Sequence, residues 1–190
     1  MSDSWDNMAA EWDSNEAVIA YSEKAFLSLG EVTKTKGLTV LDFGCGTGLL
    51  TEKLSLDAAL ITAIDPAPKM VGVLAQKGLS NVHAIVGVVD EVFVRERRQS
   101  GERFDLIVAS SALAFVPDYP ETIALLAMLL ANNGLLVQWD WEKSESSGAG
   151  FMPSEIEEAY THAGLNLVST SHPFSMGDMR VLMAVGQRID

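Results

Sequence analysis

Residues 40 to 48 read Val40-Leu41-Asp42-Phe43-Gly44-Cys45-Gly46-Thr47-Gly48, an apolar run that ends at an acid and continues into glycines at every second position. Short β-branched and leucine-rich runs are typical of buried strands in parallel sheets. Glycines let the backbone turn tightly and let a ligand approach its N–H groups. The amphipathic stretch 49–56 predicts a helix whose N-terminus presents free N–H groups to an anion. The segment therefore predicts the opening of a nucleotide-binding βαβ unit.

The spacing of these glycines separates two cofactor classes. A dinucleotide fingerprint is G-x-G-x-x-G, whereas the third glycine comes one residue earlier in this chain. The pattern resembles motif I of the class I S-adenosylmethionine-dependent methyltransferases, whose D-x-G-x-G-x-G corresponds to Asp42, Gly44, Gly46 and Gly48. The resemblance implies a methyltransferase with S-adenosylmethionine as donor and S-adenosylhomocysteine as product.

Length and composition favour one globular domain. The chain has 190 residues, of which 48% are hydrophobic, enough for a single methyltransferase domain over 1–190. We expect an N-terminal helical cap over 1–36 and a Rossmann-like core over 37–190. The net charge of -13 opposes binding to nucleic acid or to an anionic membrane. Cys45 is the one cysteine, which excludes an intramolecular disulfide and a cysteine zinc cluster, and the N-terminus has no signal-peptide pattern, so we expect a cytoplasmic protein.

Apolar runs alternate with amphipathic stretches along the chain, which is typical of a parallel sheet covered on both faces. We expect strands near 38–43, 59–64, 82–86, 104–109, 135–139, 165–171 and 179–186, and helices over 7–29, 66–78, 121–131 and 154–164. Ser154-x-x-Glu157 has the form of a capping box for the last helix. The predicted fold class is α/β, with a doubly wound, Rossmann-like, seven-stranded sheet that is mostly parallel and ends in an antiparallel hairpin. This order resembles the methyltransferase core.

Asp65 is the second marker. It closes the predicted strand 59–64, about 20 residues after the glycine turn, where a carboxylate can accept both hydroxyl hydrogens of a ribose. The resemblance implies that Asp65 binds the ribose and that Pro66 and Ala67 give an apolar edge to the adenine. The structural alternative is that Asp65 merely caps a helix before Pro66.

Other cofactor positions follow from the resemblance. It implies that Asp42 helps to hold the ammonium group of the methionine moiety and that the turn, with Cys45 and Thr47 among its residues, borders that moiety. Gly87-Val88-Val89-Asp90 aligns with a family segment that contacts adenine, although Val88 stands where an acid is usual. The structural alternatives to cofactor binding are that Asp42 caps the end of a strand and that Gly48 is required for helix packing.

The stretch after the fourth predicted strand resembles the one that lines the methyl-transfer end of the family. It contains Ser110, Ser111 and Phe115, which we include among the candidate cofactor contacts. Many small-molecule members have a histidine near 114 and 115, whereas this chain has Ala114 and Phe115. The sequence therefore assigns no catalytic base there, and the serines are also common as strand-end hydrogen bonders.

Candidate acceptor residues come from aromatic positions near the N-terminus and after the fifth predicted strand. They are Trp12, Tyr21, Trp139 and Trp141, whose rings could attract a sulfonium or hold a flat acceptor. Core packing is the alternative for each ring. The serine- and glycine-rich loop 142–152 is a further candidate wall. Asp140 is the weak candidate for a general base, with a strand-end cap as its alternative.

Histidines and the basic cluster point to no further chemistry. His83, His162 and His172 lack metal-ligand spacing, so no metal is expected. The run from Arg95 to Arg98, interleaved with acids, is interpreted as a solvated helix face. The function predicted is methyl transfer to a small-molecule acceptor by in-line displacement. The alternatives are a non-catalytic S-adenosylmethionine-binding sensor or partner subunit, a nicotinamide-dependent oxidoreductase, and a methyltransferase acting on a protein.

Overall fold

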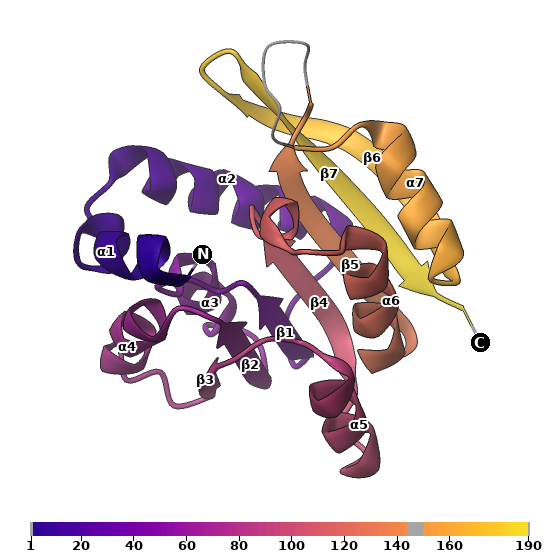
Figure 1. Cartoon of the computed structure of the whole chain (residues 1–190), viewed down its shortest axis with the longest axis horizontal. Coiled ribbons are helices and arrows are strands. Elements are labelled where there is room, and N and C mark those ends of the chain that lie inside the picture. Colours follow the sequence, from indigo (N-terminus) through magenta and orange to yellow (C-terminus); the bar gives the residue numbers. More distant parts are fainter. Residues whose placement is uncertain (1, 144–149, 190) are drawn as a thin grey trace. The chain divides into compact units, whose positions relative to one another are not determined.

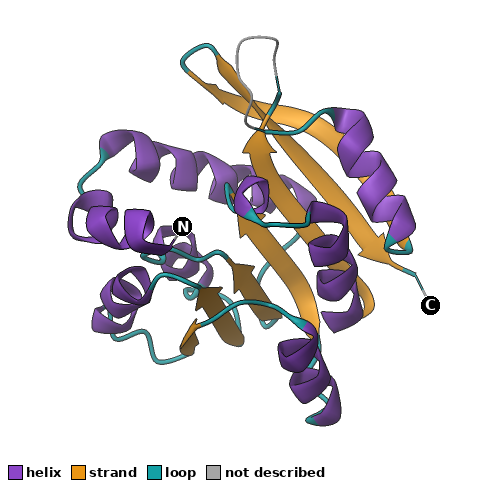
Figure 2. Ribbon diagram, viewed as in Figure 1, coloured by secondary structure: helices purple, strands orange, loops and turns teal. Residues whose placement is uncertain are grey.

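The computed structural model describes residues 2–143 and 150–189, and the chain divides into two compact units, 1–88 and 89–190. The seven predicted strands and the helices between them are present, as Figure 2 shows, so the predicted fold class is confirmed. The expectation of one domain, with a cap over 1–36, stays a prediction.

The first unit contains three parallel strands in the order β3-β2-β1 (Figure 1). They are β1 (Thr39–Phe43), β2 (Leu60–Asp65) and β3 (Val82–Val86). Their connecting helices are α3 (Leu49–Leu54) and α4 (Pro68–Gln76). Buried aliphatic side chains such as Val40, Leu41 and Ile61 place the core of this unit on β1 and β2.

The N-terminal segment forms two helices, and the single helix predicted over 7–29 is wrong. Helix α1 (Ser2–Trp12) ends before a short break, and α2 (Glu16–Val32) begins after Asn15. The Asn15 side chain accepts the backbone N–H of Ala17 at 3.0 Å, which satisfies a free donor at the start of α2. Helix α1 packs against α4, and α2 packs against α3.

The second unit contains four strands in the order β4-β5-β7-β6. Strands β4 (Phe104–Ser110) and β5 (Leu130–Trp141) are parallel, whereas β7 (Met179–Arg188) is antiparallel to β5 and to β6 (Leu165–Met176). The predicted hairpin is confirmed. Its helices are α5 (Glu91–Gln99), the short η1 (Leu113–Phe115), α6 (Tyr119–Leu129) and α7 (Pro153–His162).

Two local predictions in this unit are wrong. Strand β5 starts at Leu130 rather than near 135, because the chain stays in the sheet through a register shift and Asn133 adopts a φ of 62°. The capping box of α7 does not use Ser154 and Glu157. Instead the Glu155 carboxylate accepts the backbone N–H of Met152 at 2.7 Å, two positions earlier in the chain, since Pro153 already occupies the first helical turn.

Candidate functional site

The turn between β1 and α3 requires its glycines. Gly44, Gly46 and Gly48 have φ values of 69°, 54° and 82°, which residues with a Cβ rarely adopt. At Gly48 an added Cβ would also overlap the side chain of Leu74. The interpretation of Gly48 as a glycine required by helix packing therefore fits the structure. At Gly46 the nearest atom to such a Cβ, within the described residues, is the Trp12 Nε1 at 4.0 Å. The backbone at Gly46 is therefore open to the close approach of a ligand.

Asp65 joins the ends of β1 and β2. Its Oδ2 accepts the backbone N–H of Gly46 at 2.9 Å, and its Oδ1 accepts the backbone N–H of Ala67 at 2.8 Å. Burial raises the pKa of Asp65, while these two N–H donors act in the opposite direction. Both the capping interpretation and the ligand interpretation fit this geometry, because each carboxylate oxygen can accept a further hydrogen bond. The fixed carboxylate is preorganised for a pair of hydroxyl donors.

Asp42 lies deeper than Asp65, with 2% of its surface exposed. Its Oδ2 accepts the Thr51 hydroxyl at 2.6 Å. Burial raises the pKa of Asp42 to about 7, the Thr51 hydrogen bond opposes that shift, and the negative charge of Asp65 adds to it. The Cys45 thiol is buried beside these acids, and its pKa is raised by burial and by their charges. A cation placed at Asp42 would favour the ionised carboxylate.

The N-terminal helices are tied to the glycine turn by polar contacts. The Thr47 hydroxyl donates to Asp13 Oδ1, and Lys77 at the end of α4 pairs with the other Asp13 oxygen at 2.9 Å. The Trp12 ring packs with Trp5 against the buried residues Ala9, Ala67 and Met70. These contacts hold Trp12 beside the open face of Gly46.

The other predicted residues of the first unit differ in their exposure. Tyr21 is buried on α2, which favours the packing alternative for its ring. Ala67 is also buried, whereas Pro66 is exposed. Val88 is 57% exposed, so an apolar side chain faces solvent where the family pattern has an acid. Its role and that of Pro66 as cofactor contacts stay predictions.

In the second unit the end of β4 is a strained turn. Ser111 has a φ of 54°, a conformation that non-glycine residues adopt infrequently and that clusters at functional sites. Its backbone N–H donates to the Trp139 carbonyl at 2.7 Å, which joins the ends of β4 and β5. Ser110 is half-buried and Phe115 is 41% exposed. Val89, at the start of this unit, is buried.

A buried polar relay lies on β5. Gln138 and Asp140 are two residues apart on the strand, so their side chains share one face of the sheet. The Tyr119 hydroxyl of α6 donates to Gln138 Oε1 at 2.7 Å, and Gln138 Nε2 donates to Asp140 Oδ2 at 3.3 Å. The relay thus links a helix residue to the acid that the sequence suggested as a base.

Two atoms of this cluster are not hydrogen-bonded. Asp140 Oδ1 and the Tyr160 hydroxyl of α7 are fully buried and have no hydrogen-bond partner of good geometry among the described residues. Burial raises the pKa of Asp140 well above its usual range, with the backbone N–H of Ala114 and the Gln138 side chain acting in the opposite direction. Burial and the nearby Tyr119 and Asp140 likewise raise the pKa of Tyr160. Asp140 therefore keeps its proton to a higher pH than an exposed carboxyl group does.

The two aromatic candidates on β5 differ in their burial. Trp139 is fully buried, in agreement with the packing alternative, whereas Trp141 is half-buried. Loop residues 144–149, part of the predicted acceptor loop, lie outside the described residues. Sequence reasoning did not identify Tyr119, Gln138 or Tyr160. The alternation of Gln138 and Asp140 along a strand was the available signal for this cluster.

The described part of the chain has neither a candidate metal site nor a candidate membrane span. Within residues 2–143 and 150–189 no group of three or more His, Cys, Asp and Glu side chains could hold a metal ion. His172 instead pairs with Glu142 at 3.1 Å. No helix in the same ranges has the length and apolar character needed to cross a membrane.

The chain belongs to the methyltransferase domain family, because residues 15–170 match that family's model. Among curated relatives, a ubiquinone biosynthesis O-methyltransferase of Xanthomonas oryzae pv. oryzae is 38% identical over 100 residues, which cover 53% of this chain and 41% of the relative. The chain therefore spans about two fifths of that relative's length. The predicted resemblance to the methyltransferase family is confirmed.

Solved structures share the fold. In the Haloferax volcanii complex of the Trm112 methyltransferase activator with a putative methyltransferase, the matching chain has a TM-score of 0.80 at 17% identity, with 98% of each chain covered. A Burkholderia thailandensis 1,6-didemethyltoxoflavin-N1-methyltransferase with bound S-adenosylhomocysteine has a TM-score of 0.73 at 20% identity, with 100% of this chain and 87% of that chain covered. At these identities the likeness shows the fold.

Proposed function

We propose that this chain is an S-adenosylmethionine-dependent methyltransferase that acts on a small molecule. The observation that carries the proposal is the Asp65 carboxylate, fixed at the carboxyl ends of β1 and β2 by the N–H groups of Gly46 and Ala67. Ligands of open α/β sheets bind at this edge. Family membership and the titles of related proteins support the choice of donor and reaction.

The residues of the first unit fit this donor. Asp65 would accept the two ribose hydroxyls, and the ionised Asp42 would attract the ammonium group of the methionine moiety. The turn from Gly44 to Gly48 would border that moiety, because the space that a Cβ at Gly46 would occupy has Trp12 Nε1, at 4.0 Å, as its nearest neighbour among the described residues. Pro66 and Val88 would give apolar contacts to the adenine. When bound, the cofactor supplies an electrophilic methyl group on a sulfonium.

The chain's own residues then have two tasks, to align the acceptor and to exclude water. For the acceptor's proton we name Asp140, whose raised pKa makes its ionised form a stronger base than an exposed carboxylate. Its unpartnered Oδ1 is the atom that would receive the proton. Ser110, Ser111 and Phe115 stay predicted cofactor neighbours, and Trp141 stays a predicted acceptor contact.

A second function has one observation in its favour. Val88 replaces an acidic acceptor for the adenine amino group and is exposed, so this contact would contribute less to affinity. A protein that binds S-adenosylmethionine as a sensor or partner subunit, without catalysis, fits that loss. The two functions share the donor site and differ in turnover.

The first test is calorimetric titration of the chain with S-adenosylmethionine, S-adenosylhomocysteine and NADH. Micromolar binding of the first two ligands without binding of NADH is expected. Asp65→Ala should lose that binding, whereas Asp57→Ala, which removes an exposed acid from the same unit, should keep it. Binding of NADH alone would favour the oxidoreductase, and binding of none of the three would contradict a donor site. Methyl transfer to members of a small-molecule panel then separates the enzyme from the sensor.

A further inference from the structure

A groove of about 590 Å³ lies on the surface of the second unit, between α5 and α6. Its walls include Arg95 and Arg98 of α5, with Arg103 where the chain enters β4. Its apolar lining comes from Val94, Leu125 and Met128. This volume is in the range of small-molecule sites. The groove is therefore large enough for a ligand and lies wholly within one unit.

The arginines concentrate positive charge on an acidic protein. Four of the chain's six arginines fall between positions 95 and 103, although the net charge is -13. Arg97 is neutralised by Glu102 at 2.9 Å, and Arg103 donates to the Glu102 carbonyl at 2.7 Å. Arg95 and Arg98 are exposed and have no ion pair or side-chain hydrogen bond with another described residue. Their guanidinium groups remain available to an anion.

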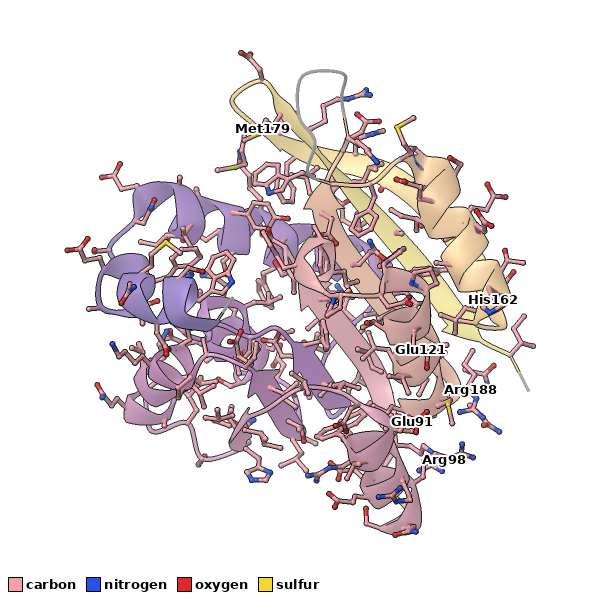
Figure 3. The ribbon with its side chains drawn as sticks, in the orientation of Figure 1. Glu91, Arg98, Glu121, His162, Met179 and Arg188 are labelled. Atoms are coloured by element: carbon pink, nitrogen blue, oxygen red, sulfur yellow. The ribbon has the colours of Figure 1, made fainter. Side chains whose placement is uncertain are left out.

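Acidic, basic and apolar side chains all line the groove. Glu91 and Glu121 lie in the first turns of the two helices, whereas Arg98 lies in the last turn of α5, and Figure 3 labels these three residues. Met128, which is 41% exposed, lies in the last turn of α6. Seven residues of helix separate Glu121 from Met128, or about 10 Å. An occupant would therefore meet guanidinium, carboxylate and apolar groups.

The basic end lies away from the edge proposed for methyl transfer. Arg103 directly precedes β4, whereas Ser110 and Ser111 follow its other end. A strand of this length spans about 20 Å. A ligand head held by the arginines would therefore be remote from the carboxyl end of β4.

We propose that the α5–α6 groove binds a soluble amphipathic anion, with a phosphate or carboxylate head on Arg95 and Arg98 and a short hydrocarbon chain over Leu125 and Met128. Arginine suits such heads because its planar guanidinium donates two parallel hydrogen bonds. Glu91 and Glu121 also line the groove and disfavour a second negative charge on the ligand. The acidic surface of the protein as a whole opposes binding to an anionic membrane, so the ligand is a free molecule.

The test is calorimetric titration of the whole chain with three probes: hexyl phosphate, inorganic phosphate and 1-hexanol. Hexyl phosphate should bind at least about tenfold more tightly than either fragment, because it uses both the head and the chain contacts. Arg95→Ala/Arg98→Ala should weaken hexyl phosphate binding by about tenfold or more. Met128→Ser should weaken hexyl phosphate but leave inorganic phosphate unchanged.

The control variant is Lys34→Ala/Lys36→Ala, which removes the same charge from an exposed segment of the first unit. It should retain hexyl phosphate binding, and all variants should retain S-adenosylmethionine binding and their melting temperature. The proposal would be overturned if the arginine variant bound hexyl phosphate as tightly as the wild type. It would also be overturned if the lysine variant lost as much hexyl phosphate affinity as the arginine variant. Co-sedimentation with phosphatidic acid vesicles in preference to binding of hexyl phosphate would assign the groove to a lipid surface instead. Capture of an acidic peptide without hexyl phosphate binding would assign it to a protein partner.

Discussion

The buried acids of the two units differ in how completely they are hydrogen-bonded. In the first unit Asp65 accepts two backbone N–H groups and Asp42 accepts a hydroxyl, so each acid has a designated donor. In the second unit one carboxylate oxygen of Asp140 has no hydrogen-bond partner among the described residues. The Tyr160 hydroxyl of the same cluster also has none. Buried polar groups are usually satisfied, and an exception needs a reason. The proposed donor site thus contains acids that each accept a hydrogen bond, whereas the polar cluster of the second unit carries unused hydrogen-bonding capacity among the described residues.

The largest expected effect is on cofactor binding in Asp65→Ala. The substitution removes the acceptor for the ribose hydroxyls and also leaves the Gly46 and Ala67 N–H groups without their partner. We expect a loss of about 3 kcal/mol, or roughly a hundredfold in Kd. Calorimetry with S-adenosylhomocysteine measures it. Asp65→Glu serves as the matched variant, and an unchanged Kd for Asp65→Ala would remove the ribose assignment.

Asp140→Asn tests the other side of the comparison. The folded-state pKa of Asp140 lies above its unfolded value of 3.8, so the folded chain keeps a proton that the unfolded chain releases as the pH rises. The wild type therefore loses stability with increasing pH between those two pKa values, whereas asparagine does not titrate. We expect Asp140→Asn to be stabilising at pH 8 by about 1–3 kcal/mol and close to neutral near pH 4. Urea unfolding at both pH values checks this, and destabilisation that is independent of pH would contradict a raised pKa for Asp140.

The sequence predicted most of the fold because the strands are short apolar runs bounded by glycine, proline and acidic residues. The prediction from the sequence failed where contacts between residues distant in the chain determine the local structure. The break before Asn15 interrupts a helical pattern, and there Asp13 pairs with Thr47 and Lys77, partners more than 30 positions away. Strand β5 continues through Asn133, whose turn-like sequence predicted a helix end.

The residues of the candidate site that belong to a local motif were predictable from the sequence, whereas those brought together by the fold were not. Asp42 and Asp65 belong to a local motif with fixed spacing, so the sequence found them. Thr51, which donates to Asp42, looks like an ordinary helix residue until the turn brings it back to the strand. The relay on β5 joins Gln138 and Asp140 to Tyr119 of α6, with Tyr160 of α7 in the same cluster, and no local pattern marks either tyrosine.

A smaller effect is expected in the pH dependence of cofactor binding. The pKa of Asp42 is raised to about 7, and the proposed ammonium contact needs the ionised form. Affinity for S-adenosylhomocysteine should therefore weaken as pH falls below 7, by about tenfold between pH 7 and pH 6 at most. Titrations at several pH values measure the slope. Asp42→Asn should bind more weakly at pH 8 and lose the slope, whereas a retained slope would place the titrating group elsewhere.

The smallest effect separates the two tyrosines of the polar cluster. Tyr119→Phe removes the hydroxyl that donates to Gln138 and should destabilise the chain by about 1 kcal/mol, since it leaves a buried amide oxygen unpaired. Tyr160→Phe removes a buried hydroxyl that has no described partner, so its effect on the free energy of unfolding should be neutral or slightly stabilising. Urea unfolding of both variants at one pH gives the difference. An equal loss in both would show that the Tyr160 hydroxyl is hydrogen-bonded in solution, and the contrast between a satisfied and an unsatisfied cluster would then no longer hold.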